Sequence, residues 1–258
     1  MRIIDRILAA FILLTRLPLW RLREVPAEAF AHVLTWWPLV GWLTGGLMAG
    51  VLRATGRVLP LGMAWLLALV TRLLVTGCIH EDGLADCCDG FGGGRTRERT
   101  LAIMKDSRIG SYGVIGLVVY FLLLTRAGCL PLPLLCAAVV GFDSWAKCCA
   151  AQAISPLPYA RTQASSKVGV VYARLRGWAW VVNVGLGLVP ALVLLPTALL
   201  PALAAPVVVA FVCNRFMHRR LQGYTGDCCG ATFLLCELSA YVVAIVLVHL
   251  SYRHCPPK

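Results

Sequence analysis

Long apolar runs separated by short polar segments fill most of this 258-residue chain. A helix that crosses a membrane needs about 20 mostly apolar residues. Seven stretches have this character: about 31–52, 58–79, 112–130, 132–152, 177–196, 198–214 and 231–250. We therefore predict an all-α fold, a polytopic integral membrane helix bundle of about seven spans.

The first two dozen residues follow a different pattern. Apolar side chains such as Ile3 and Ile7 recur at helical spacing, but Asp5 and Arg16 leave too few uncharged residues for a crossing. Basic residues flanking an apolar band are typical of helices that lie in the membrane interface. Residues 2–24 are therefore predicted to form an N-terminal interfacial helix.

Composition supports a membrane protein. Hydrophobic residues make up 59% of the chain and charged residues only 14%, and the mean hydropathy is +0.79. Because no internal repeat or low-complexity linker is visible, we expect residues 1–258 to form a single membrane domain. In such a protein the net charge of +12 sets orientation and attracts lipid headgroups, so we expect membrane lipid and no nucleic acid as partner.

The basic residues also predict the topology. With the amino terminus inside, 17 of the 24 Lys and Arg residues fall on inner segments and five on outer ones. This arrangement places three polar segments on the cytoplasmic side: 80–111, 153–176 and 215–230. The sequence thus predicts a multi-pass protein whose active site faces the cytoplasm.

One acidic stretch stands out near the end of the second predicted span. Asp82, Asp86 and Asp89 are spaced i, i+4 and i+7, so a helix would place their carboxylates on one face. Such a cluster is a solvated surface in many soluble proteins. Carboxylates at the end of a membrane segment instead favour a functional site, and oxygen ligands suit Mg²⁺, with Mn²⁺ as a substitute.

Cations follow the acidic stretch at once. Arg95, Arg97 and Arg99 precede a mixed unit at 105–108, which contains Lys105 and Arg108 among other polar residues. The positive-inside rule explains the three arginines, but it explains the mixed unit less well. A divalent metal with nearby cations is what a diphosphate substrate requires.

These residues resemble the cobalamin synthase family, also called adenosylcobinamide-GDP ribazoletransferase or cobalamin-5′-phosphate synthase. Residues 80–90 (HEDGLADCCDG) and 103–113 (IMKDSRIGSYG) carry the resemblance. Three shorter stretches are also similar: 15–18 (TRLP), 158–161 (PYAR) and 223–231 (GYTGDCCGA). The chain departs from the family in having cysteine at positions 87, 88, 228 and 229, where small residues such as Thr, Ala or Val are usual.

The resemblance implies a Mg²⁺-dependent enzyme of the bacterial cell inner membrane. Its reaction would join α-ribazole, or α-ribazole 5′-phosphate, to adenosylcobinamide-GDP, with release of GMP and formation of adenosylcobalamin or its 5′-phosphate. Two further kinds of partner are possible expectations for such an enzyme: a second copy of the chain, and other enzymes of nucleotide-loop assembly.

The resemblance and the charge pattern together assign roles to individual residues. The expected metal ligands are Asp82, Asp86, Asp89 and Asp106. The expected catalytic groups are Asp227, Asp89, Lys105 and Arg108. The expected substrate contacts are Arg95, Arg99, Ser107, Arg161, Tyr112 and His80. Two residues keep alternatives open, because Asp227 is also a suitable helix cap and His80 is also a suitable structural histidine.

Two other functions fit parts of the pattern. A CDP-alcohol phosphotransferase also has Asp-Gly-x-x-Ala followed by further acids, but Asp86 stands here where that family has an Arg. A cation-coupled transporter would have acids in the middle of its spans and an internal repeat. Asp143 and Lys147 do lie within a predicted span, where their i, i+4 spacing predicts an ion pair.

The 12 cysteines include three adjacent pairs but no CxxC motif, so they lack the usual zinc spacing. We interpret them as small packing residues. Those next to the predicted site also suggest sensitivity to oxidation.

Overall fold

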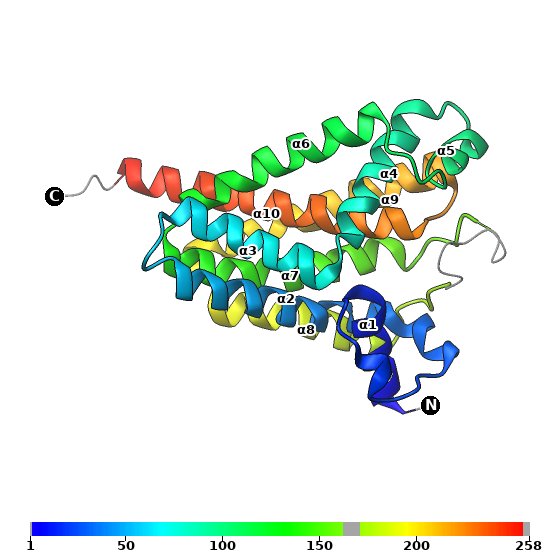
Figure 1. Ribbon diagram of the computed structural model, residues 1–258, viewed down its shortest axis with the longest axis horizontal. Helices are drawn as coiled ribbons and strands as arrows, with labels where there is room; N and C mark the ends of the chain where they lie inside the picture. The colour runs from blue at the N-terminus through cyan, green and yellow to red at the C-terminus, as the bar shows by residue number, and fades with distance from the viewer. Residues whose placement is uncertain (1, 162–170, 255–258) are drawn as a thin grey trace.

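A computed structural model describes residues 2–161 and 171–254. Within these ranges it contains helices and a single isolated bridge between Tyr159 and Tyr224, which confirms the all-α prediction. The long helices run side by side along the molecule, as Figure 1 shows. They are α2 (Val33–Thr55), α3 (Leu61–Thr76), α6 (Ser111–Thr125), α7 (Leu132–Ile154), α8 (Trp178–Leu194), α9 (Ala204–Leu221) and α10 (Gly226–His254).

Helix α7 lies at the centre of the bundle and packs against α2, α8, α9 and α10. Small residues make the closest of these contacts possible. A Cβ atom at Gly41 of α2 would lie only 2.8 Å from the Cα atom of Ser144 in α7. Close backbone approach at small residues is the usual way in which helices associate in lipid. Phe142 and Ala150 are completely buried in the resulting core.

By length and composition, fewer helices among the described residues qualify as membrane spans than the seven predicted. Among the described residues, four helical stretches qualify: Ser111–Cys129, Leu132–Ile154, Thr197–Leu221 and Gly226–Ser251. A fifth candidate is the bent pair formed by α3 and α4 (Ile79–Gly93). Helix α8 is apolar but shorter. The structure therefore supports a multi-pass protein and does not confirm the count of seven.

The amino-terminal helix is shorter than expected. Helix α1 covers Ile3–Leu14, and the rest of the predicted 2–24 helix is replaced by a turn and the short 3-10 helix η1 (Leu19–Arg21). Thr15 leaves the helical conformation, and Pro18 stands just before η1. Asp5 is buried, and its carboxylate forms an ion pair with Arg23 at 2.8 Å. This contact holds the turn against α1.

A sharp corner separates α3 from α4. The two helices meet at 88°. Gly77 and Cys78 form the corner in the left-handed conformation, with φ of 65° and 60°. Glycine adopts this conformation easily, whereas a residue with a Cβ atom is strained in it. The corner turns the acidic stretch away from the direction of α3.

The three polar segments predicted on one side meet at one end of the bundle, together with α1 and the short helix α5 (Arg97–Ile103) (Figure 1). Arg97 donates hydrogen bonds to the carbonyls of Leu221 at 2.7 Å and Ala160 at 2.8 Å. The Tyr224 backbone N–H donates to the carbonyl of Pro158 at 2.9 Å. Residues 162–170 of the segment 153–176 lie outside the described residues.

Candidate active site

The acidic stretch folds as predicted into one helix, α4. Its three aspartates differ in environment: Asp82 is exposed, Asp86 is half-buried and Asp89 is buried. At 1.5 Å per residue, Asp82 and Asp89 lie about 10 Å apart along the helix axis. The two ends of the stretch therefore face different surroundings.

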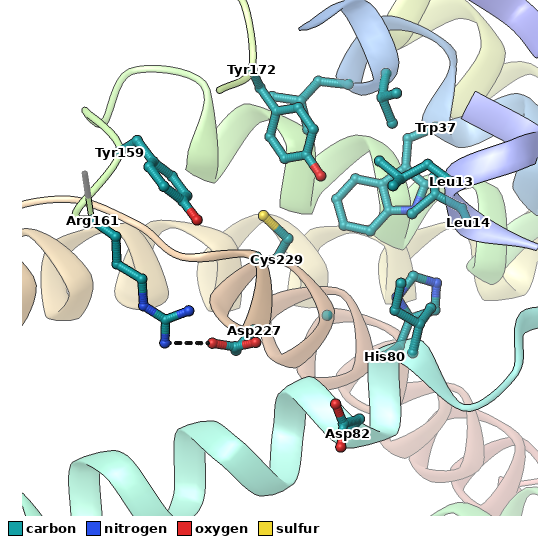
Figure 2. Close-up of a pocket in the computed structure, with 15 residues that line it drawn as sticks. Leu13, Leu14, Trp37, His80, Asp82, Tyr159, Arg161, Tyr172, Asp227 and Cys229 are labelled. Carbon is teal, nitrogen blue, oxygen red and sulfur yellow. Dashed lines mark hydrogen bonds and ion pairs between the residues drawn. The ribbon is translucent and has the colours of Figure 1, made fainter. Parts of the chain in front are cut away.

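Asp82 faces a cavity of about 880 Å³, part of which is open to solvent. Figure 2 shows Asp82 on α4 across from Asp227 at the start of α10, with Arg161 beside Asp227. His80 also lines this cavity. Four predicted site residues from three distant parts of the sequence thus share one cavity.

Two glycines set the distance between α4 and α10 at this point. A Cβ atom at Gly83 would lie 2.7 Å from the carbonyl oxygen of Asp227. A Cβ atom at Gly230 would lie 2.9 Å from the Cα atom of His80. The backbones that carry Asp82 and Asp227 are therefore in direct contact.

Charged groups gather at the polar end of the cavity. An Arg161 guanidinium nitrogen lies 3.2 Å from the Oδ2 atom of Asp227. Thr225 caps the first turn of α10 by accepting the backbone N–H of Cys228 at 3.3 Å. The positive end of the α10 dipole and the arginine together favour an anion here.

The opposite wall of the cavity is apolar and aromatic. Leu13 and Leu14 of α1 contribute to it with Trp37 of α2 and with Tyr159 and Tyr172 (Figure 2). A flat apolar ring would find a suitable surface on this wall.

His80 lies within a cluster of rings. Its imidazole lies 5.8 Å from the Trp37 ring and 4.8 Å, edge to face, from Phe233. The side chain is 3% exposed, so packing explains it well. Its Nε2 atom, however, is buried without a hydrogen-bond partner among the described residues. Because the residue also borders the cavity, both alternatives for His80 stay open.

A second group of predicted site residues lies around a shallow depression. Asp89, Arg99, Asp106, Arg108 and Tyr112 line it. The two groups of predicted site residues therefore do not share one pocket. Of the remaining predicted residues, Arg95, Lys105 and Ser107 are exposed on the same polar end.

Asp89 makes contacts that the sequence did not suggest. One carboxylate oxygen accepts the backbone N–H of Gly110 at 2.7 Å, and the other accepts that of Gly113 at 2.8 Å. These groups belong to the first turn of α6, whose N–H groups have no partner within the helix. Asp89 thus fixes α6 on α4, and its roles as metal ligand and catalytic group stay predictions.

Asp106 and Arg108 form an exposed pair, with a separation of 2.9 Å. The hydrogen bonds from Arg108 lower the pKa of the Asp106 carboxyl to about 2. Asp106 is therefore ionised across the physiological pH range.

The aspartates supply the oxygen ligands that Mg²⁺ prefers. Among the described residues, no group of three or more His, Cys, Asp or Glu side chains forms a ready-made metal site. Mg²⁺ does not require one, because it is usually held by one or two carboxylates together with water and substrate phosphates. Asp82 borders the cavity, and Asp86 follows it one turn further along α4, so two carboxylates of the kind that Mg²⁺ takes are present and the residues fit the ion.

A buried charge cluster near the site was only partly foreseen. Asp143 and Lys147 form the predicted ion pair. Arg72 of α3, however, pairs with Glu237 of α10 and Glu81 of α4. Glu237 could have been noticed, because it is the only acidic residue within the last apolar run. Its partner could not, because the contact joins residues 165 positions apart.

Comparisons with known proteins agree with the sequence resemblance. A family model described as cobalamin-5-phosphate synthase matches residues 6–245. Curated proteins named adenosylcobinamide-GDP ribazoletransferase are similar over nearly the full chain. The one from Shewanella sp. (strain ANA-3) is 35% identical over 248 residues, which is 95% of each chain. That from Shewanella amazonensis is 34% identical over 252 residues, which is 95% of this chain and 96% of the relative.

No solved structure matches the chain. The family match nevertheless covers far more than half of its length. The chain therefore belongs to the cobalamin-5-phosphate synthase family of enzymes.

Proposed function

We propose that the protein is a Mg²⁺-dependent transferase that joins α-ribazole, or its 5′-phosphate, to adenosylcobinamide-GDP and releases GMP. The relatives' names give this reaction class. The observation that carries the proposal is the convergence of Asp82, Asp227 and Arg161 on one cavity at the end of a membrane helix bundle. We place that end on the cytoplasmic side of the bacterial inner membrane, as the distribution of basic residues favours.

The reaction makes one bond and breaks one. The ribazole hydroxyl oxygen forms a bond to the phosphorus on the cobinamide side of the diphosphate, and the bond from that phosphorus to the GMP oxygen breaks. The hydroxyl proton has to leave as the new bond forms. Asp227 is the proposed acceptor, because its carboxylate borders the cavity and Arg161 stabilises its charged form.

The other groups bind and orient the diphosphate. Asp82, with Asp86 one turn further along α4, would hold Mg²⁺, which supplies Lewis-acid neutralisation of the phosphate charge. Arg161 and the first turn of α10 provide positive charge for the same oxygens. Arg99 and Arg108, at the neighbouring depression, are proposed to meet further phosphate groups. The apolar wall accommodates the aromatic base.

Asp82→Asn tests this proposal, because it removes one anionic ligand and leaves the shape of the side chain. We expect kcat/KM to fall by about 10²–10³-fold. The measurement is GMP release from adenosylcobinamide-GDP and ribazole phosphate by purified protein, with Mg²⁺ and after its removal by EDTA. Glu98→Gln is the matched control, since Glu98 is an exposed acid on α5 at the same end of the molecule.

Full Mg²⁺-dependent activity of Asp82→Asn would contradict the metal assignment. CDP-diacylglycerol as donor distinguishes the CDP-alcohol phosphotransferase alternative: turnover with this lipid and none with adenosylcobinamide-GDP would replace the proposed function.

A further inference from the structure

The buried cluster around Arg72 joins the helices that carry the site. Arg72 of α3 donates to Glu237 of α10 at 2.5 Å and to Glu81 of α4 at 3.4 Å. It also donates to the hydroxyl of Tyr120 in α6 at 3.0 Å. One guanidinium group therefore contacts three other helices. All four side chains are buried, and Arg72 is 1% exposed.

Two of these partners lie in the same helices as the proposed reacting groups. Glu81 directly precedes Asp82, and because neighbouring residues on a helix point about 100° apart, Glu81 faces the interior while Asp82 faces the cavity. Glu237 follows Asp227 by ten residues, about 15 Å along α10. The arginine thus fixes α4 next to Asp82, and fixes α10 three turns beyond Asp227.

Arg72 is located where its contacts can affect the geometry of the site. It lies in the last turns of α3, before the corner at Gly77 and Cys78 that turns the chain by 88° into α4. The corner alone leaves α4 attached at one point. The ion pair with Glu81 closes the inside of the corner, and the contact of Gly83 with Asp227 continues the alignment into the site.

We propose that Arg72 is a positioning residue, which acts through Glu81 and Glu237 to set Asp82, the proposed ligand of the divalent ion on α4, relative to Asp227 of α10. The inference depends on the proposed function, because it uses the roles proposed there for Asp82 and Asp227. Without Arg72, the buried carboxylates of Glu81 and Glu237 would lose the cation that pairs with both of them. Helix α4 would then relax away from α10 by rotation at the corner.

A hydrogen bond elsewhere in the bundle provides the matched comparison. The indole N–H of Trp145 in α7 donates to the carbonyl of Leu203, just before α9, at 2.9 Å. Neither residue lies in α4 or α10, and neither lines the cavity. Trp145→Phe should therefore lower stability without changing the site.

The experiment measures Mn²⁺ binding by the EPR signal of the free ion, using the full chain purified in lipid nanodiscs, together with thermal unfolding and GMP release. Arg72→Gln is expected to weaken Mn²⁺ binding and lower kcat by about 10–100-fold each. Arg72→Lys, which keeps the charge but loses the forked geometry, should show a smaller loss and remains available if Arg72→Gln does not fold. Trp145→Phe should lower the unfolding temperature and leave Mn²⁺ affinity unchanged.

A triple variant separates positioning from stability. Arg72→Gln, Glu81→Gln and Glu237→Gln together remove the uncompensated charges, so the unfolding temperature should return toward that of the wild type. We expect Mn²⁺ affinity and kcat to stay low, because amides do not restore the forked contact. Recovery of all three properties together would overturn the inference, as would unchanged Mn²⁺ affinity in Arg72→Gln.

The results also distinguish this inference from the proposed function. Wild-type protein that binds Mn²⁺ with dependence on Asp82 but releases no GMP would contradict the proposed function alone. Wild-type protein that binds no Mn²⁺ would overturn both.

Discussion

Asp89 shows how much a single carboxylate can do beyond the role that its sequence context implies. Its spacing from Asp82 and Asp86 gives it a place on the same helix, and the family resemblance gives it a place in the metal site. In the structure its two oxygens accept the backbone N–H groups of Gly110 and Gly113. The sequence identified an important residue, and the tertiary contacts supply a reason that no local pattern contains.

Asp89→Asn tests this structural role. The amide can accept one of the two N–H groups, but its NH₂ group faces the other, so a buried donor loses its partner. We expect a loss of about 1–3 kcal/mol in the free energy of unfolding, measured by titration with SDS. Asp106→Asn is the control, because this exposed carboxylate pairs only with Arg108 in its own loop. Unchanged stability of Asp89→Asn with loss of Mn²⁺ binding would instead make Asp89 a metal ligand.

At the scale of elements, the site depends on how closely α4 and α10 approach each other. The acids lie on two helices that are distant in sequence, and Gly83 and Gly230 are the residues at which the helices touch. Close packing at small residues and the Arg72 cluster therefore both align α4 with α10. The corner at Gly77 and Cys78 makes this alignment possible, because a straight continuation of α3 would carry the acids along a different direction.

Gly83→Ala tests the contact between the two helices. The added Cβ atom would lie 2.7 Å from the Asp227 carbonyl oxygen, so one backbone must shift. We expect kcat/KM to fall by about 10²-fold, since a displacement of the order of 1 Å has that effect. Gly46→Ala in α2 is the control, because nothing lies within 4 Å of its added Cβ atom. Wild-type activity of Gly83→Ala would show that the approach of α4 to α10 does not govern the site.

At the scale of the whole molecule, the arrangement of the polar segments implies a common side of the membrane. The segments around Arg97, Ala160 and Tyr224 are joined by direct hydrogen bonds. They must therefore lie in the same compartment, whichever way the bundle is inserted. The excess of basic residues on these segments predicts that this compartment is the cytoplasm.

Labelling with a membrane-impermeant maleimide checks this topology. The exposed Cys129 lies between α6 and α7, at the opposite end of α6 from α5. In a background with Cys78→Ser and Cys255→Ser, we expect reagent outside spheroplasts to label Cys129. With Cys129→Ser added to that background, a new cysteine in Glu98→Cys should react only in inverted vesicles. Labelling of the Glu98→Cys protein from outside would place the site on the outer face and contradict the cytoplasmic assignment.

The apolar runs are sufficient to predict the class of fold, because lipid requires every backbone polar group to be satisfied inside a helix. The motifs at 80–90 and 103–113 indicate the family and name most of the residues at the polar end. The spacing of the acids in 80–90 likewise placed them on a single helix, which the structure confirms. The ion pair of Asp143 and Lys147 also followed from local spacing alone.

Which of these residues contact one another depends on the tertiary fold and does not follow from the sequence pattern. The division of the predicted site into a cavity at Asp82 and a depression at Asp89 depends on which face of α4 each neighbouring helix covers. The partners of Arg72 and the end of α1 at Leu14 depend on contacts between distant segments. Such contacts follow from packing and charge compensation between segments that are distant in the sequence. The periodicity of the sequence therefore does not predict them.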